Sequence, residues 1–288
     1  MQSSVLAFAT DLLDEGADHF FGNLTDRAGV GGVTLASVYH QARDVFPHNP
    51  LHAVRYLEPG AAYFQPDPAR WNGLRHGFHH ERYFEQLGPV TEALLGLCFC
   101  EHCLAHATGL GVPADEVRQV VRDEIRRRLA DETAAAEPAE LDAVADGALA
   151  AYIDASVTTV TSLAAEAAAT AETHGMRLTF MDAEGPGKGW LSGIDLPSLA
   201  KAVPQIETLG YATTPEAVRE KVTAYALHGV VPDSLAVILR PMSKDCDSPE
   251  NLAAKIRMLA GLGVPEVEFY NYGLMRLSSM DRIGTALG

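Results

Sequence analysis

Two carboxylates separated by one residue are the clearest candidates for acid–base chemistry in this sequence. Asp182 and Glu184 follow an apolar run at 177–181 and precede a glycine-rich segment at 185–190. In an extended strand, side chains two residues apart point to the same face, so we expect both carboxylates at one edge of a sheet. Such a pair can divide acid and base roles when its two environments separate the pKa values. We therefore predict Asp182 as the acidic catalytic residue and Glu184 as its partner.

Polar and aromatic side chains also follow several other predicted strands. A mixed group of this kind can hydrogen-bond to a small ligand and stack on it. A structural role is the alternative for each residue, since Arg240 could pair with a neighbouring carboxylate and Tyr270 could line a wall. The predicted substrate-binding residues are His40, Trp190, Tyr211, Arg240, Tyr270, Asn271 and Tyr272.

Three of the four cysteines lie within six residues. Cys98, Cys100 and Cys103, with His102 beside them, offer the sulfur and nitrogen ligands of a tetrahedral zinc site. The alternative is that Cys98 lies on a strand, which would leave Cys100 and Cys103 as a small buried pair. We predict a structural Zn²⁺ held by these four residues and no cofactor for catalysis.

Histidines in the first half of the chain support a rival interpretation. His40, His79 and His80 could join Asp182 in a catalytic metal site, because imidazole binds metal ions and transfers protons near neutral pH. The protein would then be a zinc-dependent hydrolase or lyase. A third alternative is a protein of the same fold without enzymatic activity.

The elements that must position these residues repeat at a nearly constant interval. Six β-branched or aromatic runs are centred on Leu6, Thr34, Leu178, Glu207, Ala236 and Val267. The first two centres are 28 residues apart, and the last four are separated by 29, 29 and 31 residues. Strands that alternate with helices in this way predict an α/β fold of (β/α)₈ TIM-barrel type, in which catalytic groups lie at the carboxyl ends of the strands. For the third and fourth strands, only residues 61–64 and 94–98 are candidates, and without them the barrel is incomplete.

Two long helical segments interrupt the repeat. They cover residues 114–132 and 138–173, and we interpret residues 104–175 as a helical insertion within a single barrel-like domain spanning 1–288. If two strands are missing, the open edges of the sheet need a cover, because unpaired edges promote association. A homodimer is therefore predicted.

The composition limits the partners of this chain. Of the 288 residues, 47% are hydrophobic and 21% are charged, which excludes a disordered chain. A formal charge of −16 disfavours binding to nucleic acid and to anionic membrane surfaces. The sequence has neither a run of eighteen apolar residues nor a signal-like start, so we expect a cytoplasmic protein without a membrane-spanning helix.

Five segments, residues 38–50, 63–68, 76–83, 97–103 and 269–273, carry a family resemblance. Together they resemble a group of little-characterised bacterial proteins related to glycoside-hydrolase-like TIM barrels. The Cys-x-Cys-x₂-Cys element also looks like the cysteine cluster of some β-galactosidase barrels, where it is a structural metal site or a loop feature. The resemblance implies a barrel that acts on, or binds, a carbohydrate or glycoside.

The chain departs from this resemblance where the third and fourth strands should lie. Only five residues separate Arg70 from His76, whereas a βαβ crossover needs at least about ten to twelve residues. Retaining barrel glycosidases of this class usually carry their acid/base residue on the fourth strand. The resemblance therefore implies either an internally shortened enzyme or an inactive carbohydrate-binding relative.

Overall fold

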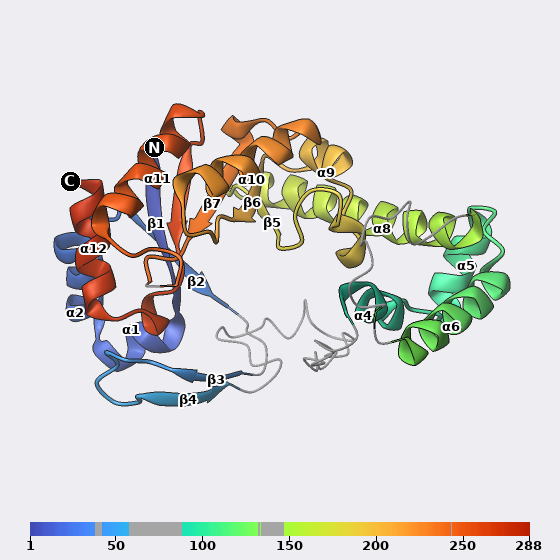
Figure 1. Cartoon of the computed structure of the whole chain (residues 1–288), viewed down its shortest axis with the longest axis horizontal. Coiled ribbons are helices and arrows are strands. Elements are labelled where there is room, and N and C mark those ends of the chain that lie inside the picture. The colour runs from blue at the N-terminus through green and yellow to red at the C-terminus, as the bar shows by residue number, and fades with distance from the viewer. Residues whose placement is uncertain (38–41, 58–87, 132, 134–146, 243) are drawn as a thin grey trace. The chain divides into compact units, whose positions relative to one another are not determined.

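A computed structural model describes residues 1–37, 42–57, 88–131, 133, 147–242 and 244–288 (Figure 1). Six strands form one sheet in the order β2-β1-β8-β7-β6-β5. They are β1 (Gln2–Phe8), β2 (Gly32–Ala36), β5 (Thr179–Asp182), β6 (Gln205–Leu209), β7 (Leu235–Leu239) and β8 (Glu266–Phe269). Each overlaps one of the six runs predicted from the sequence, although β5 begins one residue after the predicted centre at Leu178, so the period is confirmed as a signal of strands.

The pairing of the first strand identifies the fold class. β1 pairs in parallel with β2, where Val5 lies opposite Val33, and also in parallel with β8, where Val5 lies opposite Phe269. A first strand held between the second and the last is the cyclic order of a (β/α)₈ barrel, and the parallel β7–β8 pair continues it. The predicted α/β fold of TIM-barrel type is thus confirmed.

The barrel is incomplete in the part of the chain that the structure describes. Within that part, no strand occupies the sheet positions between β2 and β5. The chain after β2 instead forms an antiparallel hairpin of β3 (Ala42–Val45) and β4 (Val54–Leu57). The candidate strand at 61–64 lies outside the described residues.

The other candidate strand, residues 94–98, was wrong. The helix α4 (Gly88–Gly96) covers its first half, with Val90 and Leu94 buried in a hydrophobic core. A short apolar run fits a buried helix as well as a buried strand, so its composition could not distinguish the two. The predicted long helices are observed as α6 (Ala114–Ala130) and α8 (Gly147–Thr173).

Helices follow the strands as a βα repeat requires. The short helices α1 (Ala9–Glu15) and α2 (Ala17–Gly22) and the π-helical turn η1 (Asn23–Arg27) follow β1. The helices α9 (Leu196–Ala202), α10 (Pro215–Leu227), α11 (Pro249–Gly261) and α12 (Leu277–Leu287) follow β5, β6, β7 and β8. The hydroxyl of Ser248 accepts a hydrogen bond from the backbone N–H of Asn251, which fixes the start of α11.

The chain separates into two compact units. The first comprises Met1–Arg82, Thr208–Thr223 and Leu235–Gly288, and the second comprises Tyr83–Glu207 and Ala224–Ser234. Buried residues of α4, α6 and α8, together with α5 (Glu101–Gly109), form a helical core in the second unit. The single domain spanning 1–288 with an insertion at 104–175 remains a prediction.

The helix α8 is long and apolar enough to cross a membrane by length and composition. Core helices of soluble proteins share this property. In the second unit, 28% of its apolar window is buried. The buried residues of α8 include Leu149, Tyr152 and Ile153, and α8 packs against α6.

A glycine after β6 lets that strand approach β7 closely. The N–H of Gly210 donates to the carbonyl of Ile238, and a Cβ at position 210 would lie 2.7 Å from Cγ1 of Val237. We expect Gly210→Ala to lower the free energy of unfolding by about 1–3 kcal/mol, the usual cost of overpacking. Chemical denaturation measures this value. Gly261→Ala is the matched control, because a Cβ at position 261 meets nothing within 4 Å, and a substantial loss in the control would refute the steric explanation.

Candidate functional site

Three of the predicted ligand-binding residues lie together in the first unit. Tyr211, Arg240 and Tyr270 follow β6, β7 and β8, and each is partly exposed. The guanidinium carbon of Arg240 lies 3.9 Å from the ring centroid of Tyr211. The centroids of the Tyr211 and Tyr270 rings are 6.2 Å apart. We call these three residues the Tyr–Arg platform.

Buried charges hold the loops that carry the platform. Asp245 accepts a hydrogen bond from Nε of Arg240, so Arg240 does pair with a neighbouring carboxylate. Lys255 of α11 is 1% exposed, and its Nζ donates to the carbonyls of Ala212 and Asp245. Burial lowers the pKa of Lys255. One ammonium group therefore ties together the loop after β6 and the loop after β7.

A second polar cluster lies at the carboxyl end of β1 and is almost closed to solvent. Nε2 of His48 lies 3.2 Å from Oε1 of Glu15, and the hydroxyl of Tyr272 donates to Oε2 of Glu15 at 2.6 Å. Nδ2 of Asn23 donates to the same hydroxyl at 2.9 Å. The neighbouring Asp11 is 1% exposed, and its Oδ2 accepts from the N–H of Phe8 at 2.9 Å.

This cluster shifts the pKa values of three acids and bases. Burial raises the pKa of Asp11 to about 6, although the Phe8 N–H and nearby His48 oppose the rise. Burial would also raise the pKa of Glu15, but hydrogen bonds from His48 and Tyr272 outweigh it and lower the value. Burial would lower the pKa of His48, but its hydrogen bond with Glu15 outweighs burial and raises the value.

Two predicted ligand-binding residues belong to the buried framework. Tyr272 is fully buried, and its hydroxyl donates a hydrogen bond to Glu15. Asn271 is 3% exposed, and its side-chain oxygen accepts from the N–H of Gly273. A Cβ at position 273 would lie 2.5 Å from Oδ1 of Asp11, so the loop after β8 closes directly onto this carboxylate.

The predicted carboxylate pair lies in the second unit, and its two members differ strongly. Asp182 is 1% exposed, and its Oδ1 accepts from the N–H groups of Glu184 and Gly185 at 3.1 Å each. Its Oδ2 accepts from the Tyr225 hydroxyl at 2.7 Å. Glu184 is exposed, and Ser192 donates to its Oε1 at 2.9 Å. Because Asp182 initiates a tight turn, the two carboxylates do not share a strand face.

The remaining predicted residues have different surroundings. Trp190 is 8% exposed and belongs to the core of the second unit. His40, His79 and His80 lie outside the described residues, as does the rival catalytic metal site that they would form.

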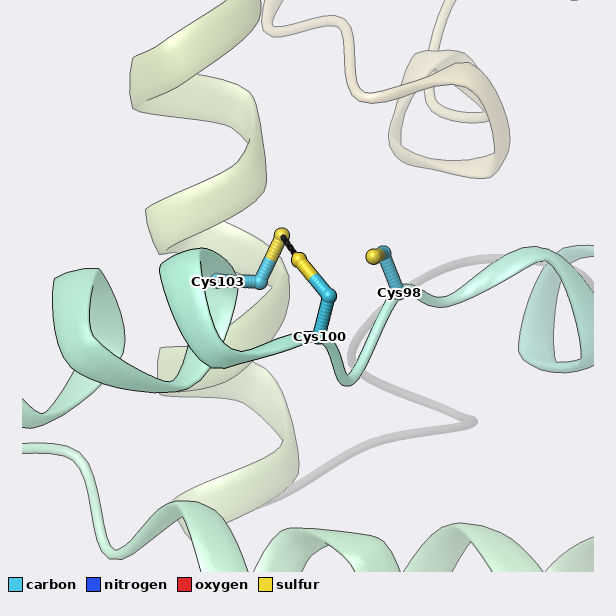
Figure 2. Close-up of side chains that lie close together, drawn as sticks. All are labelled: Cys98, Cys100 and Cys103. Carbon is cyan, nitrogen blue, oxygen red and sulfur yellow. Dashed lines mark hydrogen bonds between the residues drawn. The ribbon is translucent and has the colours of Figure 1, made fainter. Parts of the chain in front are cut away.

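The cysteines form a compact group in the second unit (Figure 2). The sulfur atoms of Cys98, Cys100 and Cys103 all lie within 4.8 Å of one another, so they are close enough to bind a metal ion. His102 is not part of this group, and its Nε2 lies 3.7 Å from a carboxylate oxygen of Glu101. Hydrogen bonds, first from the backbone N–H of Cys103, lower the pKa of Cys100 to about 7. Burial and the neighbouring thiols raise the pKa of Cys103 to about 12.

Sequence reasoning missed Lys255 and Glu15. Lys255 lies between Leu252, Ile256 and Leu259, all of which are buried. A lysine on the apolar face of a helix indicates a buried charge. Glu15 ends a short helix after β1, and nothing in its sequence context distinguishes it from an exposed acid.

The buried cluster makes stability depend on pH. A raised pKa in the folded state favours folding at low pH, and this contribution is lost as pH rises through the folded value. Between pH 5 and pH 8, Asp11 and His48 both act in this direction, whereas the lowered pKa of Glu15 has its effect below this range. The lowered pKa of Cys100 acts in the opposite direction above about pH 7, so we expect the free energy of unfolding to fall mainly between pH 5 and pH 7, with about 1 kcal/mol from Asp11 alone. Denaturation at several pH values measures it.

Asp11→Asn separates the contribution of Asp11 from the others. The amide oxygen can still accept from the Phe8 N–H, and no charge is buried at high pH. The variant should therefore lose less stability than the wild type between pH 5 and pH 8. Asp18→Asn, at an exposed position, is the control. If the stability of Asp11→Asn depends on pH as that of the wild type does, Asp11 is not a source of the pH dependence.

Comparisons with solved structures match the chain to chitinases at very low identity. The C-terminal domain of a predicted chitinase from Desulfitobacterium hafniense is 9% identical, covers 100% of this chain and 99% of that chain, and has a TM-score of 0.49. A Chromobacterium violaceum chitinase is 10% identical, with 99% of both chains covered and a TM-score of 0.43. The Ostrinia furnacalis group IV chitinase is 12% identical, with a TM-score of 0.37. The match to it covers 46% of this chain and spans only 63% of that chitinase. No family model and no curated protein matches the chain, so these structures are similar to it without establishing its family.

Proposed function

We propose that the protein binds a carbohydrate at the Tyr–Arg platform. The observation that carries this proposal is the stacking of Arg240 over Tyr211, beside Tyr270, at the carboxyl ends of three parallel-sheet strands. In barrels, ligands bind at this end because the loops that follow the strands converge there. The three side chains are only partly buried, so their faces can contact a ligand.

The chemistry of the platform suits a neutral sugar. Aromatic faces pack against the apolar faces of sugar rings, and the remaining N–H groups of Arg240 can donate to hydroxyl groups. Asp245 balances the positive charge of Arg240, which removes the attraction that an anionic ligand would need. The net charge of −16 further disfavours anionic ligands.

Hydrolysis of a glycosidic bond is the activity that we propose for Asp182 and Glu184. Such a reaction needs one carboxylic acid to protonate the leaving oxygen and a second carboxylate to act as base or nucleophile. Of the two, Glu184 is the exposed carboxylate. Asp182, whose oxygens accept three hydrogen bonds at the turn before Glu184, is the second carboxylate of this proposal.

We also propose that the three cysteines hold a structural zinc ion. Sulfur ligands about 2.3 Å from a tetrahedral zinc ion lie about 3.8 Å apart, and Sγ of Cys100 and Sγ of Cys103 are separated by 3.6 Å. A bound ion would link the segment before α5 to the first turn of that helix. His102 would have to turn away from Glu101 to supply a fourth ligand.

Removing one side chain of the platform tests carbohydrate binding. Tyr211→Leu should weaken binding about three- to tenfold, because an aromatic stacking contact contributes about 0.5–1.5 kcal/mol. Titration calorimetry against neutral oligosaccharides measures the affinity, with oligogalacturonate as the anionic comparison. Phe21→Leu, which removes an exposed ring outside the platform, is the control. Unchanged affinity in Tyr211→Leu, or the absence of any binding to the wild type, would refute the proposal.

Conservative variants of the carboxylates test hydrolysis. Glu184→Gln should lower turnover of aryl glycosides at least about a hundredfold, the scale of lost acid–base chemistry, and should leave the melting temperature unchanged. Asp182→Asn should lower the melting temperature, because it changes a buried group with three hydrogen bonds. Full activity in Glu184→Gln would end the catalytic assignment. If Asp182→Asn is destabilised but its folded fraction has the specific activity of the wild type, Asp182 has a structural role only.

A further inference from the structure

Two of the three clustered cysteines are arranged for reaction with each other. Cys100 immediately precedes α5, and Cys103 lies in its first turn, so the sequence Cys100-Glu-His-Cys103 opens a nine-residue helix. Their sulfur atoms are 3.6 Å apart, and Figure 2 shows the two side chains pointing toward each other. A disulfide bond is about 2.05 Å long, so the sulfurs need to approach by only about 1.5 Å.

The backbone that carries Cys100 is held in place from two sides. The Tyr152 hydroxyl of α8 donates to the carbonyl of Cys98 at 2.5 Å, and Arg118 of α6 donates to the carbonyl of Phe99 at 3.3 Å. The ring of Phe99 stacks on Tyr152, with centroids 5.0 Å apart, and lies under the Arg118 guanidinium. Fixed neighbours lose little conformational entropy when they react, which favours reaction within the pair over reaction between molecules.

The two thiols also differ in access to solvent. Cys100 is exposed, whereas Cys103 is partly buried against its helix. An exposed thiol can react first with a molecule from solution, and a sheltered thiol next to it can then complete an intramolecular exchange. Cys246 is buried and belongs to the first unit, so it takes no part in this cluster.

We propose that Cys100 and Cys103 form a redox-active pair that exchanges with small-molecule disulfides. The thiolate sulfur of Cys100 attacks one sulfur of the small disulfide, forms a mixed disulfide and releases one small thiolate. The sulfur of Cys103 then attacks the Cys100 sulfur, forms the intramolecular disulfide and releases the second small thiolate. The protons of the two protein thiols end on the two small thiols, and the pair is oxidised by two electrons as the small disulfide is reduced.

This inference is independent of carbohydrate binding. It makes the oxidation state of the cysteine group depend on its redox surroundings. The disulfide would remove two of the three sulfur ligands from the proposed zinc site. Cys98 would remain a free thiol, because its two neighbours would be bonded to each other. Oxidation and metal binding would thus exclude each other at this group.

Counting thiols after treatment with oxidised glutathione tests the proposal on the full chain. The protein is examined as purified and after exposure to a chelator, and thiols are titrated in denaturant. We expect the chelator-treated protein to fall from four titratable thiols to two, and dithiothreitol to restore all four. Four thiols that persist after chelation, or disulfides between molecules, would overturn the proposal.

Single serine variants identify the bonded pair and the order of attack. Cys98→Ser should still close the disulfide, which excludes Cys98 as a partner, and Cys103→Ser should accumulate one glutathione adduct on Cys100. Cys100→Ser should form no internal disulfide, and Cys246→Ser is the control that should behave as the wild type. Failure of Cys98→Ser to close the bond, with an unchanged melting temperature, would overturn the assignment. Added zinc should slow the oxidation; if it does not, the zinc proposal fails and the disulfide proposal stands.

Discussion

The pairing of β1 with both β2 and β8 is the constraint on which the first unit depends. It joins the second residue of the chain to a strand that begins at Glu266. The backbone hydrogen bonds on both edges of β1 are therefore complete only when the beginning and the end of the sequence meet. β7, the neighbour of β8, is apolar and all five of its residues are buried, as expected where both faces of a parallel sheet are covered. The loop after β8, which carries Tyr270 and Tyr272, starts from a strand end that this pairing fixes.

Buried charged groups link several loops of the first unit to one another. Lys255 joins two loops through their carbonyl oxygens, and Glu15 joins His48 of the hairpin to Tyr272 of the loop after β8. An unpaired charge in these positions would cost several kcal/mol, and the hydrogen bonds of Lys255 and the contacts of Glu15 with Tyr272 and His48 offset this cost. The Tyr–Arg platform depends on the same principle, since Asp245 holds the Arg240 guanidinium in place over its ring.

The sequence predicted the elements better than the orientation of their side chains. Runs of β-branched residues at a constant spacing are a property of the chain itself, which is why all six strands could be placed. Residues 94–98 failed because a run of five apolar residues carries no periodicity. The pairing of Asp182 with Glu184 failed for a different reason: the rule that alternate residues share a face holds only inside a strand, and the turn already begins at Asp182. The buried contacts of Glu15 and Lys255 join segments far apart in the sequence, so no local pattern could reveal them fully.

Side chains of the connecting loop and base of the β3–β4 hairpin attach it to the first unit. Phe46 packs against Phe8, His48 faces Glu15, and Arg55 binds Asp14, whereas Val45 and Val54 are exposed. A segment with few buried apolar groups and mostly polar attachments opens at a lower free energy than the sheet beside it. We therefore expect the hairpin to open as a separate cooperative unit, so that its backbone amides exchange with solvent while the β1–β8 pairing stays intact.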